Sequence, residues 1–452
     1  MSTKPNKKLI DIPTEIHFLI TLHLSLNDLF SLLLTCKTLS SVAHQQLYSE
    51  LHFGVSRNVF ENRGMMLPRP LGVGDDFHIR INPEKTSRLL ATINNGKEKG
   101  IDVMDSLRYT RSLVIHEFLF HFSLNGRYRY HAKFKEISLT FGRMVENREL
   151  PGLRRVFLNL QDVVSQDIEK IREALEKRFE SDPDTSVSVA LKLTASALNR
   201  EFRPEYSLLS RINPGILTHL DLQFSIRNVW VDGLEREAEK LGLTTETGNA
   251  KPEIEHLIKT LSRAPRLKVL RLESLLRNSA SNPQYEIFDI EIIREELERL
   301  QTTILGLEKL ETLVTCGVIF HHSWFIIPPP SVRILSFTGP FSDAWYKEFA
   351  KQPLIGVEDL TIEYFDDRCG DWESSDGWGL DLEEVAVEGL KSFRFGGYDG
   401  PEGWVDGLIE KNKGLKVVRG DIGVGRMHAA GWRFYCTGGG DEYWLRSNSN
   451  KL

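Results

Sequence analysis

The sequence predicts an α/β fold in which a small N-terminal three-helix unit precedes an irregular solenoid of strands and helices. Apolar residues repeat at helical spacing through residues 12–51. From about residue 107, apolar residues instead recur at positions i, i+3 and i+5, the spacing of a turn followed by a short strand. Amphipathic helical segments lie between these strands, and an alternation of strands with helices favours a parallel sheet.

Length and composition place the chain among folded proteins. Its 452 residues are enough for two or more domains or one extended array, and 41% of them are hydrophobic. The formal net charge of −6 argues against a broad nucleic-acid-binding face, which needs an excess of basic residues. Four widely separated cysteines without a Cys-x-x-Cys pair indicate a reducing compartment and provide no zinc ligand set. We therefore expect a cytoplasmic and/or nuclear protein without a metal or another cofactor.

Residues 12–51 predict two short apolar helices followed by a third, more polar one. Pro13 suits a first helical turn, where its missing N–H has no intrahelical partner, and Glu15 lies where the helix dipole favours a negative charge. Ser25 and Asp28 are three residues apart and precede a new apolar run, the pattern of a capping box.

These helices carry more apolar residues than one buried stripe needs. Phe18 and Leu22 extend the first stripe, and Phe30 and Leu34 extend the second. Helices that are apolar nearly all round are normally buried all round, yet a unit of roughly 40 residues cannot bury so much surface alone. The surplus must face a downstream part of the chain, a membrane or a second protein.

The same residues carry a family resemblance. Residues 12–51 resemble an F-box of the fungal type, whose pattern combines Leu-Pro-x-Glu-Ile with spaced aliphatic residues, Asp-Leu and a late Cys-Lys. The matches align without a gap and are Ile12-Pro13, Glu15-Ile16, Ile20, Leu24, Asp28-Leu29, Leu32 and Cys36-Lys37. Ile12 replaces the usual leucine, and Thr38-Leu39 stands where many members have a tryptophan.

The resemblance implies a substrate-recognition adaptor of a ubiquitin ligase and not an enzyme. In this family the F-box docks on the Skp subunit of a cullin-based ligase, and the rest of the chain holds a protein substrate. The residues expected to contact the Skp-type adaptor are Pro13, Ile16, Ile20, Leu24, Leu29, Leu32, Cys36 and Lys37. The implied partners are this adaptor, through it a cullin, and an unknown protein substrate, with no nucleic acid and no membrane.

The sequence leaves other interpretations open. The helices could cap the chain's own downstream domain. A membrane span is disfavoured because Asp28 near its centre would cost roughly 2.5–3.5 kcal/mol on insertion scales. A Skp-bound scaffold that is not degradative would share the F-box, so the sequence does not separate it from a degradative adaptor. An enzyme of unrecognised class is the remaining alternative.

The chain divides into four predicted segments: a flexible tail (1–8), the F-box (9–51), a linker and irregular segment (52–106) and a substrate-binding domain (107–446). The last contains apolar triplets that resemble degenerate leucine-rich repeats. They are Phe134/Ile137/Leu139, Leu153/Val156/Leu158, Leu217/Leu220/Leu222, Leu267/Leu270/Leu272, Val332/Leu335/Phe337, Val357/Leu360/Ile362 and Leu390/Phe393/Phe395. Two amphipathic helices are predicted between them, with stripes Val164–Phe179 and Ile290–Ile304.

The spacing of these triplets is irregular. Leu153 and Leu217 are 64 residues apart, whereas Val332 and Val357 are 25 apart, and regular leucine-rich repeats run about 20–29 residues. An ordinary α/β domain is therefore the competing interpretation of this region.

No motif predicts a catalytic site. The chain has neither a Gly-x-Ser-x-Gly elbow nor a Gly-x4-Gly-Lys-Ser/Thr phosphate loop. His116-Glu117 is followed by His121, one residue too far for the zinc-binding pair His-Glu-x-x-His.

Two regions are candidate substrate-binding surfaces. On each predicted strand, the residue between the last two apolar positions points away from the core. These residues are Ser138, Phe157, Asp221, Arg271, Val314, Ser336, Thr361 and Arg394. From this row we select Asp221, Arg271, Thr361 and Arg394. The second region is the acidic segment 366–384, where Trp372 and Trp378 would suit a basic partner.

Overall fold

The structure is a computed structural model in which two compact units, residues 1–196 and 197–452, form separate contact clusters. The residues that it describes are 12–21, 24, 26–35, 37–53, 79–81, 89–95, 104–116, 127–161, 168–181, 187–194, 208–226, 250–276, 294–316, 325–338, 345, 349, 351–352, 354–363, 387–396, 410–419, 432–436 and 442–446.

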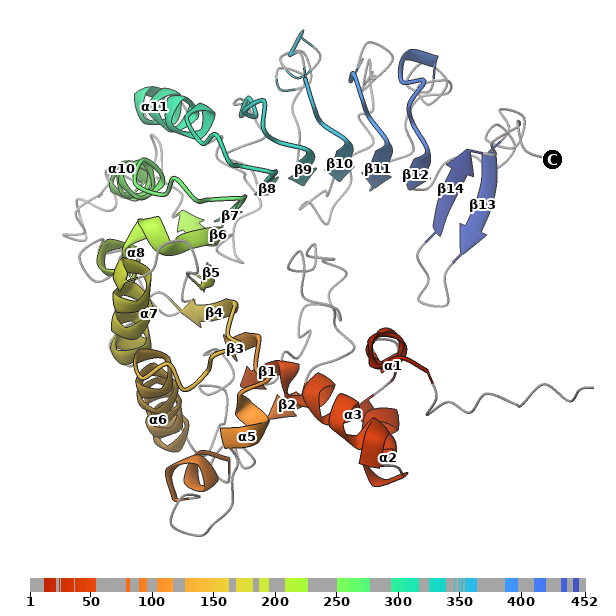
Figure 1. The fold of residues 1–452 in the computed structure, drawn as a ribbon. Coiled ribbons are helices and arrows are strands. Elements are labelled where there is room, and N and C mark those ends of the chain that lie inside the picture. Colours follow the sequence, from red (N-terminus) through yellow and green to blue (C-terminus); the bar gives the residue numbers. More distant parts are fainter. Residues whose placement is uncertain are drawn as a thin grey trace, which may run out of the picture. The chain divides into compact units, whose positions relative to one another are not determined.

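The first unit begins with the three predicted helices (Figure 1). They are α1 (Thr14–Thr21), α2 (Leu26–Thr35) and α3 (Lys37–Ser49). The elements that follow are β1 (Glu50–Phe53), β2 (Ile79–Ile81), α5 (Met104–Leu107), β3 (Ser112–His116), α6 (Arg127–Glu146), β4 (Arg155–Gln161), α7 (Glu169–Ser181) and β5 (Ser188–Thr194). Residues 89–95 are also helical.

The second unit alternates helices with strands and then continues as strands (Figure 1). Its elements are α8 (Leu208–Arg211), η6 (Pro214–Ile216), β6 (Leu217–Ile226), α10 (Ala250–Leu261), β7 (Val269–Leu276), α11 (Arg294–Leu305), β8 (Thr312–Cys316), β9 (Ile334–Thr338), β10 (Asp359–Glu363), β11 (Ser392–Gly396), β12 (Val417–Arg419), β13 (Trp432–Cys436) and β14 (Glu442–Arg446).

The predicted parallel order is confirmed in both units. In the first unit the strand order is β2-β1-β3-β4-β5, and each strand is parallel to its neighbours. In the second unit β6 to β12 lie side by side in chain order and in parallel. An antiparallel hairpin of β13 and β14 then pairs with β12 through β14. The fold is thus a mixed α/β structure whose long parallel sheet is solenoid-like.

Register places the predicted apolar positions in continuous columns. In the second unit, Leu220, Leu270, Leu313, Leu335, Leu360, Phe393 and Val418 are successive register partners. All seven are buried. Because each strand presents the same position to its neighbour, the core continues from strand to strand without interruption.

A second repeated feature is the charged residue that precedes each strand. Lys268, Glu311, Arg333, Glu358 and Lys391 occupy this position in five successive strands. The Nζ atom of Lys268 lies 2.8 Å from a carboxylate oxygen of Glu311. Glu358 binds Arg333 at 2.9 Å on one side and Lys391 at 2.7 Å on the other. The alternating signs therefore add ionic contacts between neighbouring strand segments.

One predicted strand is wrong. Phe134, Ile137 and Leu139 belong to helix α6, so Ser138 is not on a strand face. Ile137 is buried whereas Leu139 is exposed, which is the alternation expected around a helix. The error arises because a spacing of three residues is shared by helices and by the repeat pattern.

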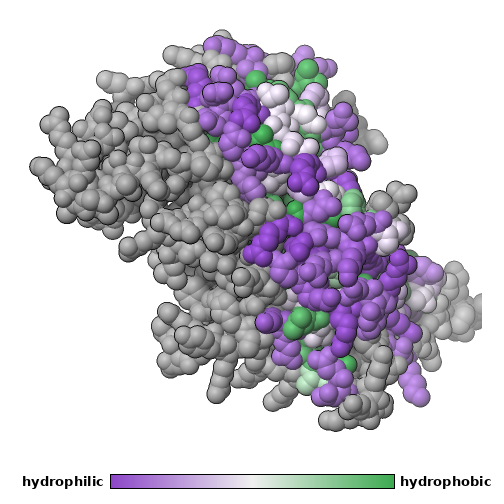
Figure 2. All heavy atoms as spheres, turned by 90° about the vertical axis from the view of Figure 1, so that its left-hand side faces the viewer, coloured by the Kyte–Doolittle hydropathy of each residue, from purple (hydrophilic) through white to green (hydrophobic). Residues whose placement is uncertain are grey.

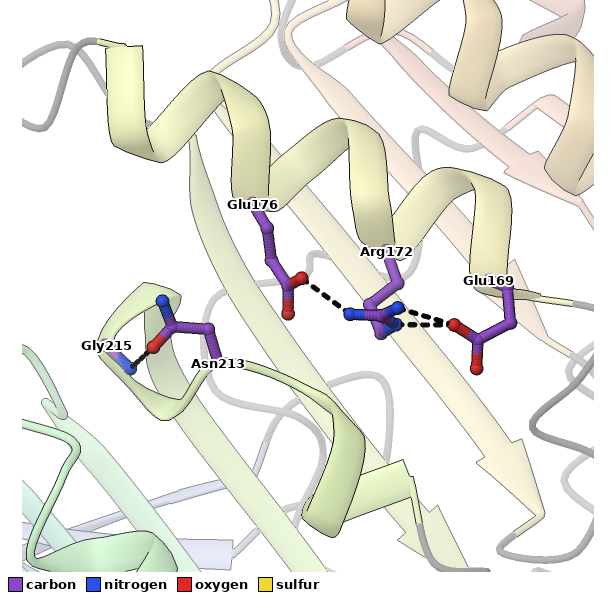
Figure 3. A network of polar contacts seen from close by, with 5 residues as sticks. All are labelled: Glu169, Arg172, Glu176, Asn213 and Gly215. Atoms are coloured by element: carbon purple, nitrogen blue, oxygen red, sulfur yellow. Dashed lines mark hydrogen bonds and ion pairs between the residues drawn. The ribbon is translucent and has the colours of Figure 1, made fainter.

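Both predicted amphipathic helices are present as α7 and α11, whereas the predicted starts of their stripes, Val164 and Ile290, lie outside the described residues. In α7 the buried side chains are Ile171, Ala174 and Leu175, and α11 buries Leu297, Leu300 and Ile304. On a partly buried side of α7, Arg172 binds Glu169 and Glu176, one helical turn away in each direction (Figure 3). In the second unit, the Asn213 side chain caps η6 by accepting a hydrogen bond from the N–H of Gly215 at 3.0 Å (Figure 3).

The helices of both units expose hydrophilic faces. In the view of Figure 2, hydrophilic residues cover most of the coloured surface, and hydrophobic residues are scattered among them. Such scattered hydrophobic residues are normal on a protein surface.

Candidate functional site

Helix α1 starts as its sequence predicts. The carbonyl oxygen of Pro13 accepts hydrogen bonds from the N–H groups of Ile16 at 3.0 Å and His17 at 3.2 Å. At the other end, the Thr21 hydroxyl donates to the carbonyl of Phe18 at 2.9 Å, and the N–H of Leu24 donates to the carbonyl of Thr21 at 3.3 Å. The short helix is therefore closed at both ends by local hydrogen bonds.

A small apolar core holds the helices together. Leu29 of α2 packs with Ala43 and Leu47 of α3, and all three are at most 1% exposed. Leu24, Leu32, Leu33 and Tyr48 are partly buried against this core. Helices α1 and α2 both contact α3, so α3 is the element on which the other two are positioned.

The opposite side of α1 and α2 exposes large apolar side chains. In α1, the exposed fractions are 42% for Ile16, 56% for Leu19 and 39% for Ile20. In α2, they are 48% for Phe30 and 89% for Leu34. We call these five residues the docking face. The sequence prediction of surplus apolar surface is thus confirmed for Phe30 and Leu34, whereas Phe18 is half-buried and Leu22 lies outside the described residues.

The predicted adaptor contacts divide into exposed and buried residues. Pro13, Ile16, Ile20 and Lys37 are exposed, and Leu24 and Leu32 are half-buried. Leu29 requires a correction, because its side chain is enclosed by Ala43 and Leu47 and offers no surface to a partner. Cys36 lies outside the described residues. Leu19, Phe30 and Leu34 are exposed but do not belong to the predicted set of adaptor contacts, although the surplus of apolar residues in the sequence included Phe30 and Leu34.

At β6 and β7, the charged residues of the predicted strand face pair with one another and are largely buried. Arg271 and its register partner Asp221 lie 3.8 Å apart, Nε to Oδ1. Arg271 also binds Glu273 at 3.2 Å, and both are buried, at 6% and 4% exposed. Arg271 therefore satisfies neighbouring carboxylates and is not available to a substrate, which corrects its assignment as a binding residue. Asp221 is half-buried in the same cluster.

Cys316 on β8 lies beside this cluster and is buried. Burial and the nearby carboxylate of Glu273 raise the pKa of its thiol to about 12. The thiol is therefore protonated at neutral pH and is not a nucleophile.

The side chains of the strand face are more exposed on β10 and β11 than on β7. Arg394 is half-buried and binds Glu363 at 2.8 Å, Nε to Oε1. Burial raises the pKa of Glu363, and Arg394 opposes that rise. Burial likewise raises the pKa of Asp359, and Arg419 opposes it. Thr361, between these two carboxylates on β10, is half-buried. Trp372 and Trp378 lie outside the described residues.

Among the described residues, no group of three or more histidine, cysteine, aspartate or glutamate side chains is arranged to hold a metal ion. None of the helices in the described ranges is long and apolar enough to cross a bilayer.

Comparison with known families decides the nature of the three helices. Residues 9–54 match the family model described as F-box-like, which covers about a tenth of the chain. The chain carries an N-terminal F-box-like domain. This confirms the resemblance noted in the sequence, whereas the fungal type stays a prediction. No curated protein matches the chain.

An F-box-like domain is a substrate-adaptor module and is not catalytic. It indicates, in general terms, a role as a substrate adaptor in ubiquitin ligation. The matched residues include α1, α2, α3 and β1, so the docking face lies within the domain.

The F-box-like domain continues directly into the sheet of the first unit. Helix α3 ends at Ser49 and strand β1 begins at Glu50, without an intervening loop. Leu51 and Phe53 of β1 are fully buried, and β1 pairs with both β3 and β2. His44 of α3 also packs edge-on against Tyr48, with ring centroids 4.9 Å apart, and lies 6.3 Å from the ring of Tyr109 beyond α5. The domain is therefore attached by strand pairing and side-chain packing.

Proposed function

We propose that this protein is the substrate-recognition subunit of a Skp–cullin–F-box ubiquitin ligase. The docking face of α1 and α2 binds the Skp-type adaptor, and the strand face of the sheet holds a protein substrate. The observation that carries the proposal is the exposure of Ile16, Leu19, Ile20, Phe30 and Leu34 within a matched F-box-like domain.

The energetics of the docking face support an obligate partner. Burying exposed apolar surface stabilises a complex by roughly 25 cal/mol per Å² before the cost of association. Of the eight large hydrophobic residues that are exposed in the described parts of the chain, five belong to this face. Such a concentration within two short helices is typical of a protein–protein interface.

The mechanism needs no catalytic residue in this chain. An adaptor that holds a substrate near a charged ubiquitin-conjugating enzyme raises the local concentration of the substrate lysine, and this effective concentration accelerates transfer. The cullin joins the assembly through the Skp-type adaptor, in the cytoplasm and/or the nucleus.

The sheet of the second unit belongs, in this proposal, to a degenerate leucine-rich-repeat-like array. Three features support it: the parallel strands follow chain order, the apolar triplets fall into register columns, and each strand begins one or two residues after a buried apolar residue such as Leu267, Val332 or Leu390. Stacked units of this kind commonly bind partners along the strand face.

Co-purification with a Skp-type adaptor tests the docking face. The full-length chain carrying Ile20→Asp or Leu34→Asp should lose the adaptor, because each change places a charge in an apolar interface. Ile355→Asp is the matched control, since Ile355 is an exposed apolar residue of the second unit, at 63%. Retention of the adaptor by both docking-face variants would contradict the proposal.

The alternative of a non-degradative scaffold shares the same docking face. Recovery of a cullin with the wild-type complex, together with accumulation of a bound protein when the chain is deleted, supports the ligase. An adaptor complex that never contains a cullin would favour the scaffold.

A further inference from the structure

The last four strands of the second unit share a distinctive face. Val418 of β12 is fully buried, so Val417 and Arg419 occupy the positions of opposite parity, on the outward face. The outward face of β12 continues onto β14 and β13, because Val417 lies opposite Leu445 of β14 and Leu445 lies opposite Arg433 of β13. On the other side of β12, Arg419 lies opposite Arg394 of β11. Directly opposite residues share a face of the sheet, so three arginines lie on one side.

Among the outward positions of these four strands whose side chains the structure describes, none is acidic. These positions are Ser392, Arg394, Val417, Arg419, Leu445 and Arg433. Arg419 and Arg433 are exposed, whereas Arg394 is half-buried and tied to Glu363 of β10. We call Arg394, Arg419 and Arg433 the arginine face.

The arginine face differs from the rest of the strand face. At β6 and β7, Arg271 is neutralised by Asp221 and Glu273 and is buried. Like charges on neighbouring strands repel, so Arg394 opposite Arg419 costs stability unless an anion lies nearby. Glu363 supplies one such charge for Arg394. Among the described residues, no ion pair within 4 Å is formed by the side chains of Arg419 and Arg433.

We propose that the arginine face binds an acidic segment of a partner protein, and that such a segment defines the class of substrate. This inference rests on the proposed function, in which the strand face holds the substrate. Arginine suits the role because its planar guanidinium binds a carboxylate through two parallel hydrogen bonds.

The spacing of the arginines fits an extended acidic segment. Neighbouring strands lie about 4.8 Å apart, and every second side chain of an extended peptide repeats after about 6.6–6.8 Å. Arg394 and Arg419 are one strand apart, and Arg433 is two strands further on. Carboxylates on alternate residues of a segment that crosses β11 to β13 therefore reach all three. A nucleic acid is disfavoured because the chain has a net charge of −6.

Asp359 provides a second way to alter this face. It lies on β10 and attracts Arg419 electrostatically across β11. Replacing it with asparagine removes a competing negative charge while it retains the shape of the side chain. The arginine face of Asp359→Asn should therefore attract acidic segments more strongly than that of the wild-type protein.

Fluorescence anisotropy with a fluorescein-labelled deca-glutamate peptide tests the proposal on the full-length chain. The peptide should bind at low ionic strength and dissociate as salt is added, because exposed charges are screened. The double variant Arg419→Glu/Arg433→Glu should bind about tenfold more weakly, and Asp359→Asn about two- to threefold more tightly, as expected for exposed charge pairs. Arg419→Gln/Arg433→Gln should lie between the wild-type protein and the charge reversal.

A matched control distinguishes a local effect of the arginine face on peptide binding from the effect of the protein's net charge. Arg263→Glu/Lys309→Glu makes the same change in net charge at two exposed residues of the second unit, and it should leave the affinity within about twofold of wild type. Circular dichroism verifies that each variant is folded. Equal losses in the two double variants, or no binding by the folded wild-type chain at low salt, would overturn the proposal.

Two further readouts distinguish this proposal from its alternatives. A deca-thymidylate that binds more tightly than deca-glutamate, and that the arginine variants release, would identify a nucleic-acid surface instead. Retention of the Skp-type adaptor is measured in the same preparations. Because the adaptor binds the docking face of the first unit, failure of peptide binding with the adaptor retained overturns only the arginine face.

Discussion

The backbone N–H of Arg111 donates a hydrogen bond to the carbonyl oxygen of Ser49 at 2.7 Å. Ser49 is the last residue of α3, and Arg111 immediately precedes β3. The F-box-like domain and the sheet of the first unit thus share backbone hydrogen bonds at the position where one becomes the other. In the proposed complex, an adaptor bound by α1 and α2 would therefore be connected to this sheet without a flexible joint at residues 49–50.

Phe53 should be essential for this connection. It is fully buried in β1, and its ring lies 4.8 Å from the ring of Phe141 on α6, centroid to centroid. Phe53→Ala should destabilise the first unit by about 3–5 kcal/mol, the usual cost of deleting a buried aromatic ring. Urea denaturation measures the loss. Leu139→Ala, an exposed change on the same helix as Phe141, is the control and should have little effect.

Leu29 and Leu34 should separate folding from docking. Leu29→Ala removes a buried side chain and should cost about 2–5 kcal/mol of stability. Leu34 is 89% exposed, so Leu34→Ala should change the stability of the isolated chain by less than about 0.5 kcal/mol. It should nevertheless weaken binding of the Skp-type adaptor. A large stability loss from Leu34→Ala would mean that the docking face already packs against the chain itself.

Glu358 should make stability depend on pH. Hydrogen bonds from Lys391, and the charge of Arg333, hold the pKa of its carboxyl below the ordinary value. A carboxyl whose pKa is lowered by folding stabilises the folded state above its unfolded pKa of about 4.3, and this contribution is lost as pH falls through the folded pKa.

Glu358→Gln should therefore be less stable than the wild-type protein at pH 7, and the difference should shrink on acidification toward pH 3. Thermal denaturation over this pH range measures both. A difference that stays constant with pH would show that the charge of Glu358 does not contribute.

Gly356 and Gly389 should resist substitution to different extents. Their φ angles of 84° and 93° lie in the left-handed region that favours glycine. A side chain there costs about 1–2 kcal/mol. A Cβ atom added to Gly356 would also lie 3.2 Å from the carbonyl oxygen of Pro330. A Cβ atom added to Gly389 would meet no such neighbour within 4 Å. Gly356→Ala should thus be more destabilising than Gly389→Ala in urea denaturation, and the reverse order would contradict this explanation.

Much of the fold could be predicted because its signals are local. Pro13, Asp28 and the apolar stripes define the helices of the F-box-like domain, and Leu220, Leu270 and Leu335 define strands through simple spacing. The strand face was predicted in part, since Asp221 and Arg271 are register partners, as are Thr361 and Arg394, whereas Ser138 lies in helix α6.

What could not be predicted depends on tertiary contacts. Strand β1 has only four residues, Glu50–Phe53, and its burial results from pairing with β3, about 60 residues later. Helix α6 was mistaken for a repeat because Ile137 follows Phe134 by three residues, a spacing that strands and helices share. Arg271 is neutralised by Glu273 and Asp221 together. No sequence pattern distinguishes such an arginine from one that is exposed and can bind a partner.

The order of the strands in the second unit has a consequence for synthesis. Strands β7 to β12 each pair with the strand made just before them, so a nascent chain emerging from the ribosome meets each of these partners as soon as the next segment is released. Growth then ends when the antiparallel hairpin of β13 and β14 attaches to β12. Ribosome-bound truncations that stop after β9 or β11 would already possess a partial sheet, whereas only chains that include β14 would carry the hairpin.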